Sequence, residues 1–161
     1  MLDRRRLLAF AAALTLPTGI SPAQAQEKLP VVASFSVLGD FVKQIGKDRV
    51  AVTTLVGPDG DAHVYSPTPA DAKTMAGARL VIVNGLEFEG WLTRLIKSSG
   101  TKATVATATA GITPLEADDG HDHGKTGHGH AHDHGGVDPH AWQNVANAKI
   151  YAANIRDALI K

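Results

Sequence analysis

The chain has 161 residues, no cysteine, and equal numbers of basic and acidic residues, with 16 Lys plus Arg and 16 Asp plus Glu. Balanced charge without a cluster of one sign argues against a nucleic-acid partner. Because there is no thiol, an exported form of this protein has to fold without disulfides. Any metal site must therefore be built from imidazole and carboxylate groups.

The first 25 residues have the pattern of a signal peptide. Arg4 to Arg6 precede the apolar run Leu7 to Leu16, and the segment ends in Ala23 to Ala25 with the sequence A-Q-A. The apolar run is shorter than the about 20 residues that span a bilayer, and the A-x-A ending matches a signal-peptidase site. We expect cleavage after Ala25 and a periplasmic location. The sequence leaves the secretory and twin-arginine routes open.

In residues 26–161, segments rich in β-branched residues alternate with helical patterns. This alternation predicts an α/β fold with a parallel sheet flanked by helices. In chain order we expect strand Val31–Ser34, helix Val37–Gly46, strand Val50–Val56, helix Ala70–Ala76, strand Leu80–Val83, helix Glu89–Ser99, strand Thr104–Ala106 and helix Asn144–Lys161. The last helical pattern has no stop signal before Lys161. We therefore expect the chain to be one lobe of a longer protein.

Two expected helix starts carry acidic residues. Thr68 is a suitable N-cap for the second helix, with Pro69 at its first position and Asp71 at its third. Glu87 and Glu89 lie at the expected start of the third helix, where the helix dipole favours carboxylates whatever the function. We assign these acidic residues structural roles.

A tract of residues 116–136 consists mainly of histidines, acidic residues and glycines, and it has no aromatic residue. Such a composition cannot form a core, so we expect a disordered, flexible His-rich loop. Neutral imidazole is a good ligand for zinc, copper and nickel, and neighbouring carboxylates attract cations. The alternative is a low-complexity linker without a metal role. The candidate metal ligands of this loop are His121, His123, His128, His130, His132 and His134.

The other two histidines, His63 and His140, lie in loops rich in proline and glycine at predicted strand ends. In open α/β sheets, ligands bind at the carboxyl ends of the strands. A backbone fixed by proline and glycine also favours a preorganised site. From spacing alone, each histidine is either a metal ligand or a residue that hydrogen-bonds within its loop. The pattern does not decide between these two roles.

Three segments together resemble landmarks of a known family. They are Gly60–Asp71 (GDAHVYSPTPAD), Asn84–Trp91 (NGLEFEGW) and Asp138–Trp142 (DPHAW). Their order and spacing are similar to those of the metal-specific solute-binding proteins of bacterial ABC importers, and the resemblance covers essentially all of residues 26–161. The His-rich insertion between the second and third landmarks resembles that of the zinc-uptake members.

This resemblance implies a protein of two α/β lobes joined by a long helix, with one metal ion in the cleft between them. His63 and His140 would be two of its ligands, and the other two would come from a second lobe that has no counterpart here. A monomer that captures zinc and delivers it to a membrane ABC permease, without catalysis, is the implied function. Two nitrogens on one tetrahedral zinc lie roughly 3.3 Å apart, so both rings should face a common point.

The other landmark residues have expected supporting roles. We expect Trp91 and Trp142 to pack against neighbouring side chains. A ligating imidazole usually has a hydrogen-bonded partner on its second ring nitrogen. The candidates for this partner are Asp61, Asp71 and Asp138, and the sequence does not distinguish among them.

Three other functions compete with zinc transport. A manganese- or iron-specific carrier of the same family would favour a carboxylate-rich site, with Mn²⁺ in place of Zn²⁺. A periplasmic metal store would use only the His-rich loop. A zinc hydrolase would need a general base beside a bound water, and the sequence contains no H-E-x-x-H motif.

Overall fold

The computed structural model describes residues 26–116 and 136–161. The predicted signal peptide and the six loop histidines, His121, His123, His128, His130, His132 and His134, lie outside these residues. The described elements are β1 (Leu29–Phe35), α1 (Ser36–Gly46), a 3-10 turn (Lys47–Arg49), β2 (Val50–Val56), α2 (Pro69–Ala76), β3 (Leu80–Val83), α3 (Leu92–Ser99), β4 (Thr104–Thr107), a second 3-10 turn (Ala141–Gln143) and α4 (Val145–Leu159). The predicted α/β fold is confirmed.

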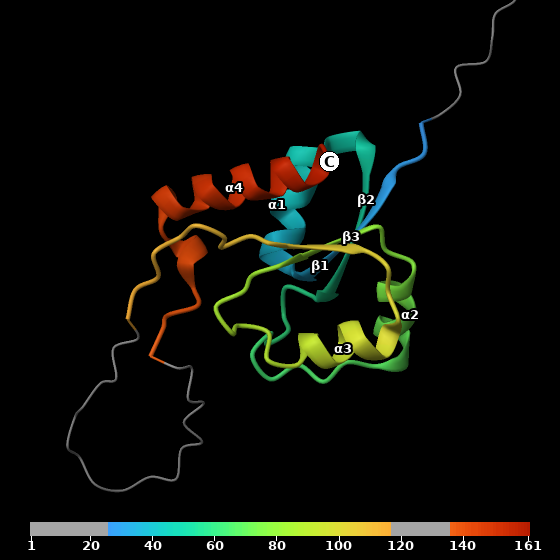
Figure 1. Cartoon of the computed structure of the whole chain (residues 1–161), viewed down its shortest axis with the longest axis horizontal. Helices are drawn as coiled ribbons and strands as arrows, with labels where there is room; N and C mark the ends of the chain where they lie inside the picture. The colour runs from blue at the N-terminus through green and yellow to red at the C-terminus, as the bar shows by residue number, and fades with distance from the viewer. Residues whose placement is uncertain (1–25, 117–135) are drawn as a thin grey trace, which may run out of the picture.

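The four strands form one parallel sheet in the order β2-β1-β3-β4. The chain passes from β1 to β2 through α1 and then crosses back to β3 through α2. Figure 1 shows α1 and α4 on one face of the sheet and α2 and α3 on the other. The strand order therefore reverses between β1 and β3, and a crevice at their carboxyl ends is the expected ligand site of such a sheet.

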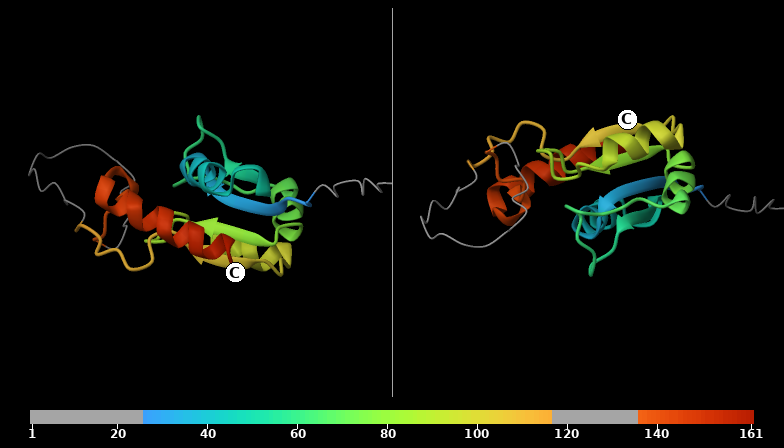
Figure 2. Two further views of the ribbon diagram at one scale, coloured as in Figure 1. Left: turned by 90° about the horizontal axis from the view of Figure 1, so that it is seen from above. Right: turned by 90° about the horizontal axis from the view of Figure 1, so that it is seen from below.

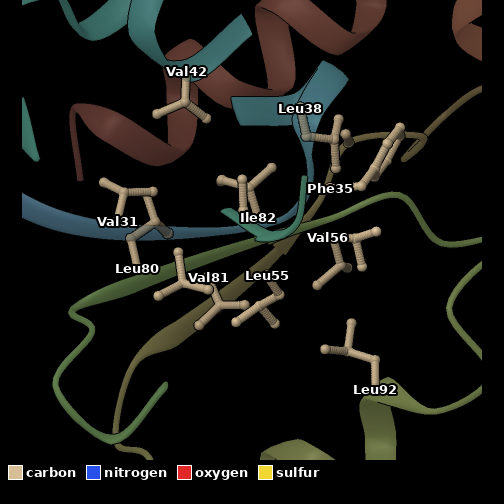
Figure 3. Close-up of a cluster of buried hydrophobic side chains, with 14 of the residues drawn as sticks. Val31, Phe35, Leu38, Val42, Leu55, Val56, Leu80, Val81, Ile82 and Leu92 are labelled. Atoms are coloured by element: carbon tan, nitrogen blue, oxygen red, sulfur yellow. The ribbon is translucent and has the colours of Figure 1, made fainter. Parts of the chain in front are cut away.

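The core fills both faces of the central strands. Val31 in β1 and Ile82 in β3 are almost fully buried, which explains why these strands are largely apolar on both faces. Figure 3 shows Leu38 of α1 on one side of the strands and Leu92 of α3 on the other. From above and below, Figure 2 shows α4 lying along the sheet, and Tyr151 of α4 has no exposed surface. Helices therefore cover both faces of the sheet.

The predicted start of the third helix at Glu89 is wrong. Gly85, Leu86 and Glu87 have φ angles of 88°, 54° and 60°, so the chain makes a left-handed turn there, and α3 begins only at Leu92. Glu89 does not occupy the first turn of a helix. Its side chain is 7% exposed and points back toward the end of β3, where it accepts hydrogen bonds.

The predicted start of α2 is confirmed. Thr68 and Asp71 form a capping box, in which each side chain accepts a hydrogen bond from the backbone of the other, and Pro69 occupies the first helical position. The last helix ends at Leu159 rather than continuing to Lys161 as predicted. Within the described residues, no helix is both long and apolar enough to cross a membrane.

Candidate metal centre

His63 and His140 come together at the carboxyl edge of the sheet, although 77 positions separate them in the chain. His63 lies in the loop that follows β2, and His140 lies just before the 3-10 turn that leads into α4. Their Nε2 atoms are 3.0 Å apart, and their ring centroids are 5.1 Å apart. This separation is close to the roughly 3.3 Å expected for two nitrogens on one tetrahedral zinc ion.

Asp138 orients the ring of His140. Its Oδ1 accepts hydrogen bonds from the backbone N–H of His140, at 2.9 Å, and from the ring Nδ1, at 2.8 Å. These two bonds hold the pKa of the Asp138 carboxyl below its ordinary value, against a weaker opposing effect of burial. Since Nδ1 faces the carboxylate, Nε2 is directed to the shared point with His63. Of the three aspartates that the sequence left open, Asp138 contacts the second nitrogen of a site histidine.

The loop that carries His63 is fixed on both sides of the histidine. Asp61 Oδ1 accepts a hydrogen bond of 2.8 Å from the backbone N–H of His63. The buried indole N–H of Trp91 donates to the carbonyl of Ala62 at 2.7 Å. The ring of His63 packs edge-on against Phe88, with ring centroids 4.5 Å apart. Trp91 therefore packs as predicted and also holds the backbone next to the candidate ligand.

Aromatic rings line the inner side of the histidine pair. Phe88 contacts Phe35 at the end of β1, with centroids 4.9 Å apart, and Trp142, with centroids 5.1 Å apart. Trp142 in turn lies edge-on to His140 at 5.3 Å. Each imidazole thus packs against at least one aromatic ring. The packing role predicted for Trp142 is confirmed.

Asp71 forms its hydrogen bonds at the start of α2. Its Oδ2 accepts hydrogen bonds from the Tyr65 hydroxyl and from the backbone and hydroxyl of Thr68, at 2.9, 2.7 and 2.8 Å. Burial raises the pKa of Asp71, but these hydrogen bonds outweigh it and hold the pKa below its ordinary value. Asp71 thus ties the loop of His63 to the start of α2.

Two polar residues beneath the site, Glu89 and Asn84, make contacts that the sequence did not predict. Glu89 accepts hydrogen bonds from the backbone of Asn84 and Gly85 and from the Ser34 hydroxyl. Burial raises the pKa of Glu89, and these hydrogen bonds only partly offset it. Asn84 has no exposed surface and donates to the carbonyl of Pro139. Both residues lie in the second landmark, which is the sequence signal that could have pointed to them. The landmark does not show which groups they hydrogen-bond.

The donor set at this edge is small. Within residues 26–116 and 136–161, no group of three or more histidine or acidic side chains is arranged to hold a metal ion. A hollow of about 530 Å³ adjoins His140 and is lined by Leu115 and Val145 among others. A larger hollow of about 700 Å³, beside Ile45 and Arg79, is at the other end of the strands and lacks both histidines. The candidate site is the histidine pair, because two imidazole nitrogens meet there.

The root of the His-rich loop lies beside this pair. Glu116 and Val137 form an isolated antiparallel bridge, and the backbone N–H of Asp138 donates to the carbonyl of Leu115 at 2.9 Å. The two ends of the loop are therefore held together two residues before His140.

Comparison with known proteins agrees with this architecture. Residues 31–161 match the family described as zinc-uptake complex component A, periplasmic (ZnuA). The manganese-binding lipoprotein MntA of Halalkalibacterium halodurans is 35% identical over 136 residues, which are 84% of this chain and 40% of the relative. The chain spans less than half the length of such curated relatives, for example 48% of a putative metal-binding protein of Treponema pallidum.

Solved structures of metal-binding proteins are also similar to this chain. The Mn-bound periplasmic metal-binding protein of Candidatus Liberibacter asiaticus superposes with a TM-score of 0.68 at 36% identity, over 82% of this chain and 45% of that one. Zn(II)-bound AdcA of Streptococcus pneumoniae superposes with a TM-score of 0.65 at 25% identity, over 83% and 26% of the two chains. Since the family match extends over well more than half of the sequence, this chain belongs to the ZnuA family of periplasmic metal-binding proteins.

Proposed function

We propose that this chain forms one lobe of a periplasmic solute-binding protein that captures zinc and delivers it to a membrane ABC permease. The observation that carries the proposal is the His63–His140 pair, whose Nε2 atoms lie 3.0 Å apart at the carboxyl edge of the sheet. The protein acts as a monomer, and it binds its cargo without catalysing a reaction. Export by the predicted signal peptide places it where such cargo is collected.

Zinc is favoured over manganese by the chemistry of the two donors. Neutral imidazole suits zinc, whereas carboxylate and water suit manganese. Relatives do not separate the two metals, since MntA is named for manganese and the AdcA structure is named for zinc. The runner-up is therefore a manganese or iron carrier of the same family. Donors beyond the described residues would complete the coordination shell and decide between these metals.

The His-rich loop has an auxiliary role in this proposal. Its six histidines add weaker sites, and the bridge between Glu116 and Val137 joins the two ends of the loop close to His140 in the chain. A metal store would use the loop alone. Replacement of the loop histidines distinguishes the two functions. A carrier would retain a site at His63 and His140, whereas a store would lose its metal binding.

The test therefore starts from a background variant of the complete two-lobe protein in which all six loop histidines are replaced by serine. In this background, His63→Ala and His140→Ala should each weaken zinc binding at least about tenfold, since each removes a ligand. Gln143→Ala, an exposed neighbour in the same segment, is the matched control and should bind like the background. Competition with a chromophoric chelator measures all four affinities.

Unchanged affinity in either histidine variant would overturn the proposed site. Loss of all binding in the background variant would instead favour the metal store. Affinity alone does not separate zinc from manganese, because nearly any nitrogen site prefers zinc. The metal content of the protein recovered from cells supplied with both ions addresses that question, and manganese as the main ion would favour the runner-up.

A further inference from the structure

Asn84, directly after β3, connects the core to the segment that carries His140. Its side-chain amide donates two hydrogen bonds, to the carbonyl of Gly85 at 3.1 Å and to the carbonyl of Pro139 at 2.9 Å. Its amide oxygen accepts a hydrogen bond of 2.6 Å from the hydroxyl of Tyr151. The side chain therefore joins β3, the segment before the 3-10 turn, and α4 at one buried point.

Only one orientation of this amide satisfies its surroundings. Two carbonyl oxygens, from Gly85 and Pro139, need two N–H donors, so the NH₂ group faces them and the oxygen faces Tyr151. Burial and the nearby Glu89 carboxylate raise the pKa of Tyr151, so its hydroxyl keeps its proton and donates. A flipped amide would set its oxygen against two carbonyls. Tyr151 and the two carbonyls thus determine the orientation of Asn84.

The backbone of Asn84 is held just as firmly. Its N–H donates to Glu89 at 2.7 Å, and its carbonyl accepts hydrogen bonds from the hydroxyl and the backbone N–H of Thr109, at 2.6 and 3.2 Å. The side chain therefore projects from a fixed base. A donor on a fixed base constrains the position of its acceptor, which here is the peptide that links Pro139 to His140.

His140 is consequently held from two directions. Asp138 fixes the tilt of its ring, but Asp138 belongs to the same short segment and moves with it. The side chain of Asn84, which directly follows β3, donates a hydrogen bond to this segment. The acceptor is the carbonyl of Pro139, the residue before His140. Without that bond the segment keeps its internal geometry but loses a tie to the sheet. The distance from His140 to His63 then depends on packing and on the backbone hydrogen bond from Asp138 to Leu115, which does not come from the sheet.

We propose that Asn84 is a positioning residue for metal binding, which holds the Pro139–His140 peptide so that both imidazoles meet at one ion. Tyr151 supports this role by orienting the Asn84 amide. The inference rests on the proposed function, since it assigns Asn84 a task only if His63 and His140 share a metal. A purely structural Asn84 would alter stability and leave the affinity of the folded protein unchanged.

The chain offers a matched control for this test. Asn154 in α4 also donates two hydrogen bonds from its side-chain amide to backbone carbonyls, those of Ala108 and Ala110, at 2.8 and 2.9 Å. Neither carbonyl belongs to a segment that carries a candidate ligand. Asn84→Asp and Asn154→Asp thus make the same chemical change, since each sets a carboxyl group against two carbonyl oxygens, at two different places.

Both variants are made in the background without loop histidines, and zinc affinity and thermal stability are measured for each. We expect Asn84→Asp to weaken zinc binding about 10- to 100-fold, the usual effect of losing a residue that orients a ligand. Asn154→Asp should lower stability without changing the affinity. In metal-free protein, NMR signals of the His140 ring should shift in the first variant and stay in place in the second.

Equal loss of affinity in both variants, or unchanged affinity in a folded Asn84→Asp, would overturn the inference. Should Asn84→Asp not fold, Tyr151→Phe decides, because it keeps the buried ring and removes only the hydroxyl that orients Asn84. We expect Tyr151→Phe to weaken zinc binding, and unchanged affinity would again overturn the inference. Failure of the proposed function is distinct, since His63→Ala and His140→Ala would then leave zinc binding intact.

Discussion

Replacement of Asp71 by alanine tests how the loop of His63 is tied to α2. The Asp71 carboxylate accepts hydrogen bonds from Tyr65 and from two groups of Thr68, and it stands in the first turn of α2. Asp71→Ala leaves these donors to water and removes a negative charge from the positive end of the helix. The predicted effect is therefore a loss of stability that depends on the charge of one carboxylate.

The magnitude follows from the contacts. Loss of one half of a capping box costs roughly 0.5–2 kcal/mol, and a carboxylate near a helix N-terminus contributes about 0.3–1 kcal/mol. Because the site is partly exposed and screened by water, we expect a total of about 1–2 kcal/mol. For a domain of this size, that corresponds to a fall in Tm of about 4–10 °C.

The dependence on pH has a definite sign. The folded-state pKa of Asp71 lies below its ordinary value of 3.8, so its stabilising effect is fully present above pH 3.8. This effect is lost as the pH falls through the lower, folded-state pKa. The difference in stability between the native sequence and Asp71→Ala should therefore be constant near neutral pH and should shrink in acid.

Thermal unfolding followed by circular dichroism, at several pH values from neutral to strongly acidic, measures this difference. Asp59→Ala is the matched control, because Asp59 is an exposed aspartate in the loop that carries His63. We expect the control to change stability by less than about 0.5 kcal/mol. Equal destabilisation by both substitutions, or a difference that widens in acid, would refute the reasoning.

Two further predictions concern the buried carboxylate and the His-rich loop. Glu89→Ala leaves three donors without their acceptor and should destabilise the fold by at least about 3 kcal/mol, whereas exposed Glu87→Ala should have little effect in the same unfolding assay. The intact chain should bind more than one zinc ion near pH 7.5 and fewer near pH 5.5, because histidine ligates only when neutral and its ordinary pKa is about 6.5. Calorimetry gives this stoichiometry, and an unchanged value after replacement of the loop histidines would make the loop a plain linker.

The sequence predicted the strands and most helices because their signals are local. Continuous apolar runs such as Leu80–Val83 can be buried on both faces only in a sheet covered by helices, and the structure has that arrangement. The start of α2 was predictable for the same reason, since a capping box is formed by residues three positions apart. Periodicity and capping therefore sufficed for the fold.

The start of α3 was mispredicted because the deciding interactions are not local. A helix would place Glu89 in its first turn, but the structure uses this carboxylate to satisfy the backbone of Asn84 and Gly85 and the hydroxyl of Ser34, 55 residues away. The left-handed turn at Leu86 and Glu87 is needed to bring the carboxylate back. A hydrogen bond over such a separation has no signature in the spacing of apolar residues.

The role of Asp138 was likewise undetermined, because Asp61 and Asp138 stand in the same position relative to a histidine. Each accepts a hydrogen bond from the backbone N–H two residues later, and Asp138 in addition accepts one from the ring Nδ1 of His140. The ring of His140 also packs against Phe88 and Trp142, which are distant in the chain or outside the shared turn. Sequence spacing predicts the shared turn and not the rotamer.

That difference makes the two candidate ligands unequal before metal arrives. Because Asp138 faces Nδ1 of His140, this nitrogen carries the hydrogen, and Nε2 presents a lone pair. Nε2 of His63 lies 3.0 Å from Nε2 of His140, so when both rings are neutral it donates a hydrogen to that lone pair. In this arrangement Nε2 of His140 is the nitrogen with a lone pair for the proposed metal ion, whereas Nε2 of His63 has to lose its hydrogen before it can bind the same ion. In the proposed carrier, the ion would take the place of that shared hydrogen, between two nitrogens whose separation is close to the roughly 3.3 Å that a tetrahedral zinc ion needs.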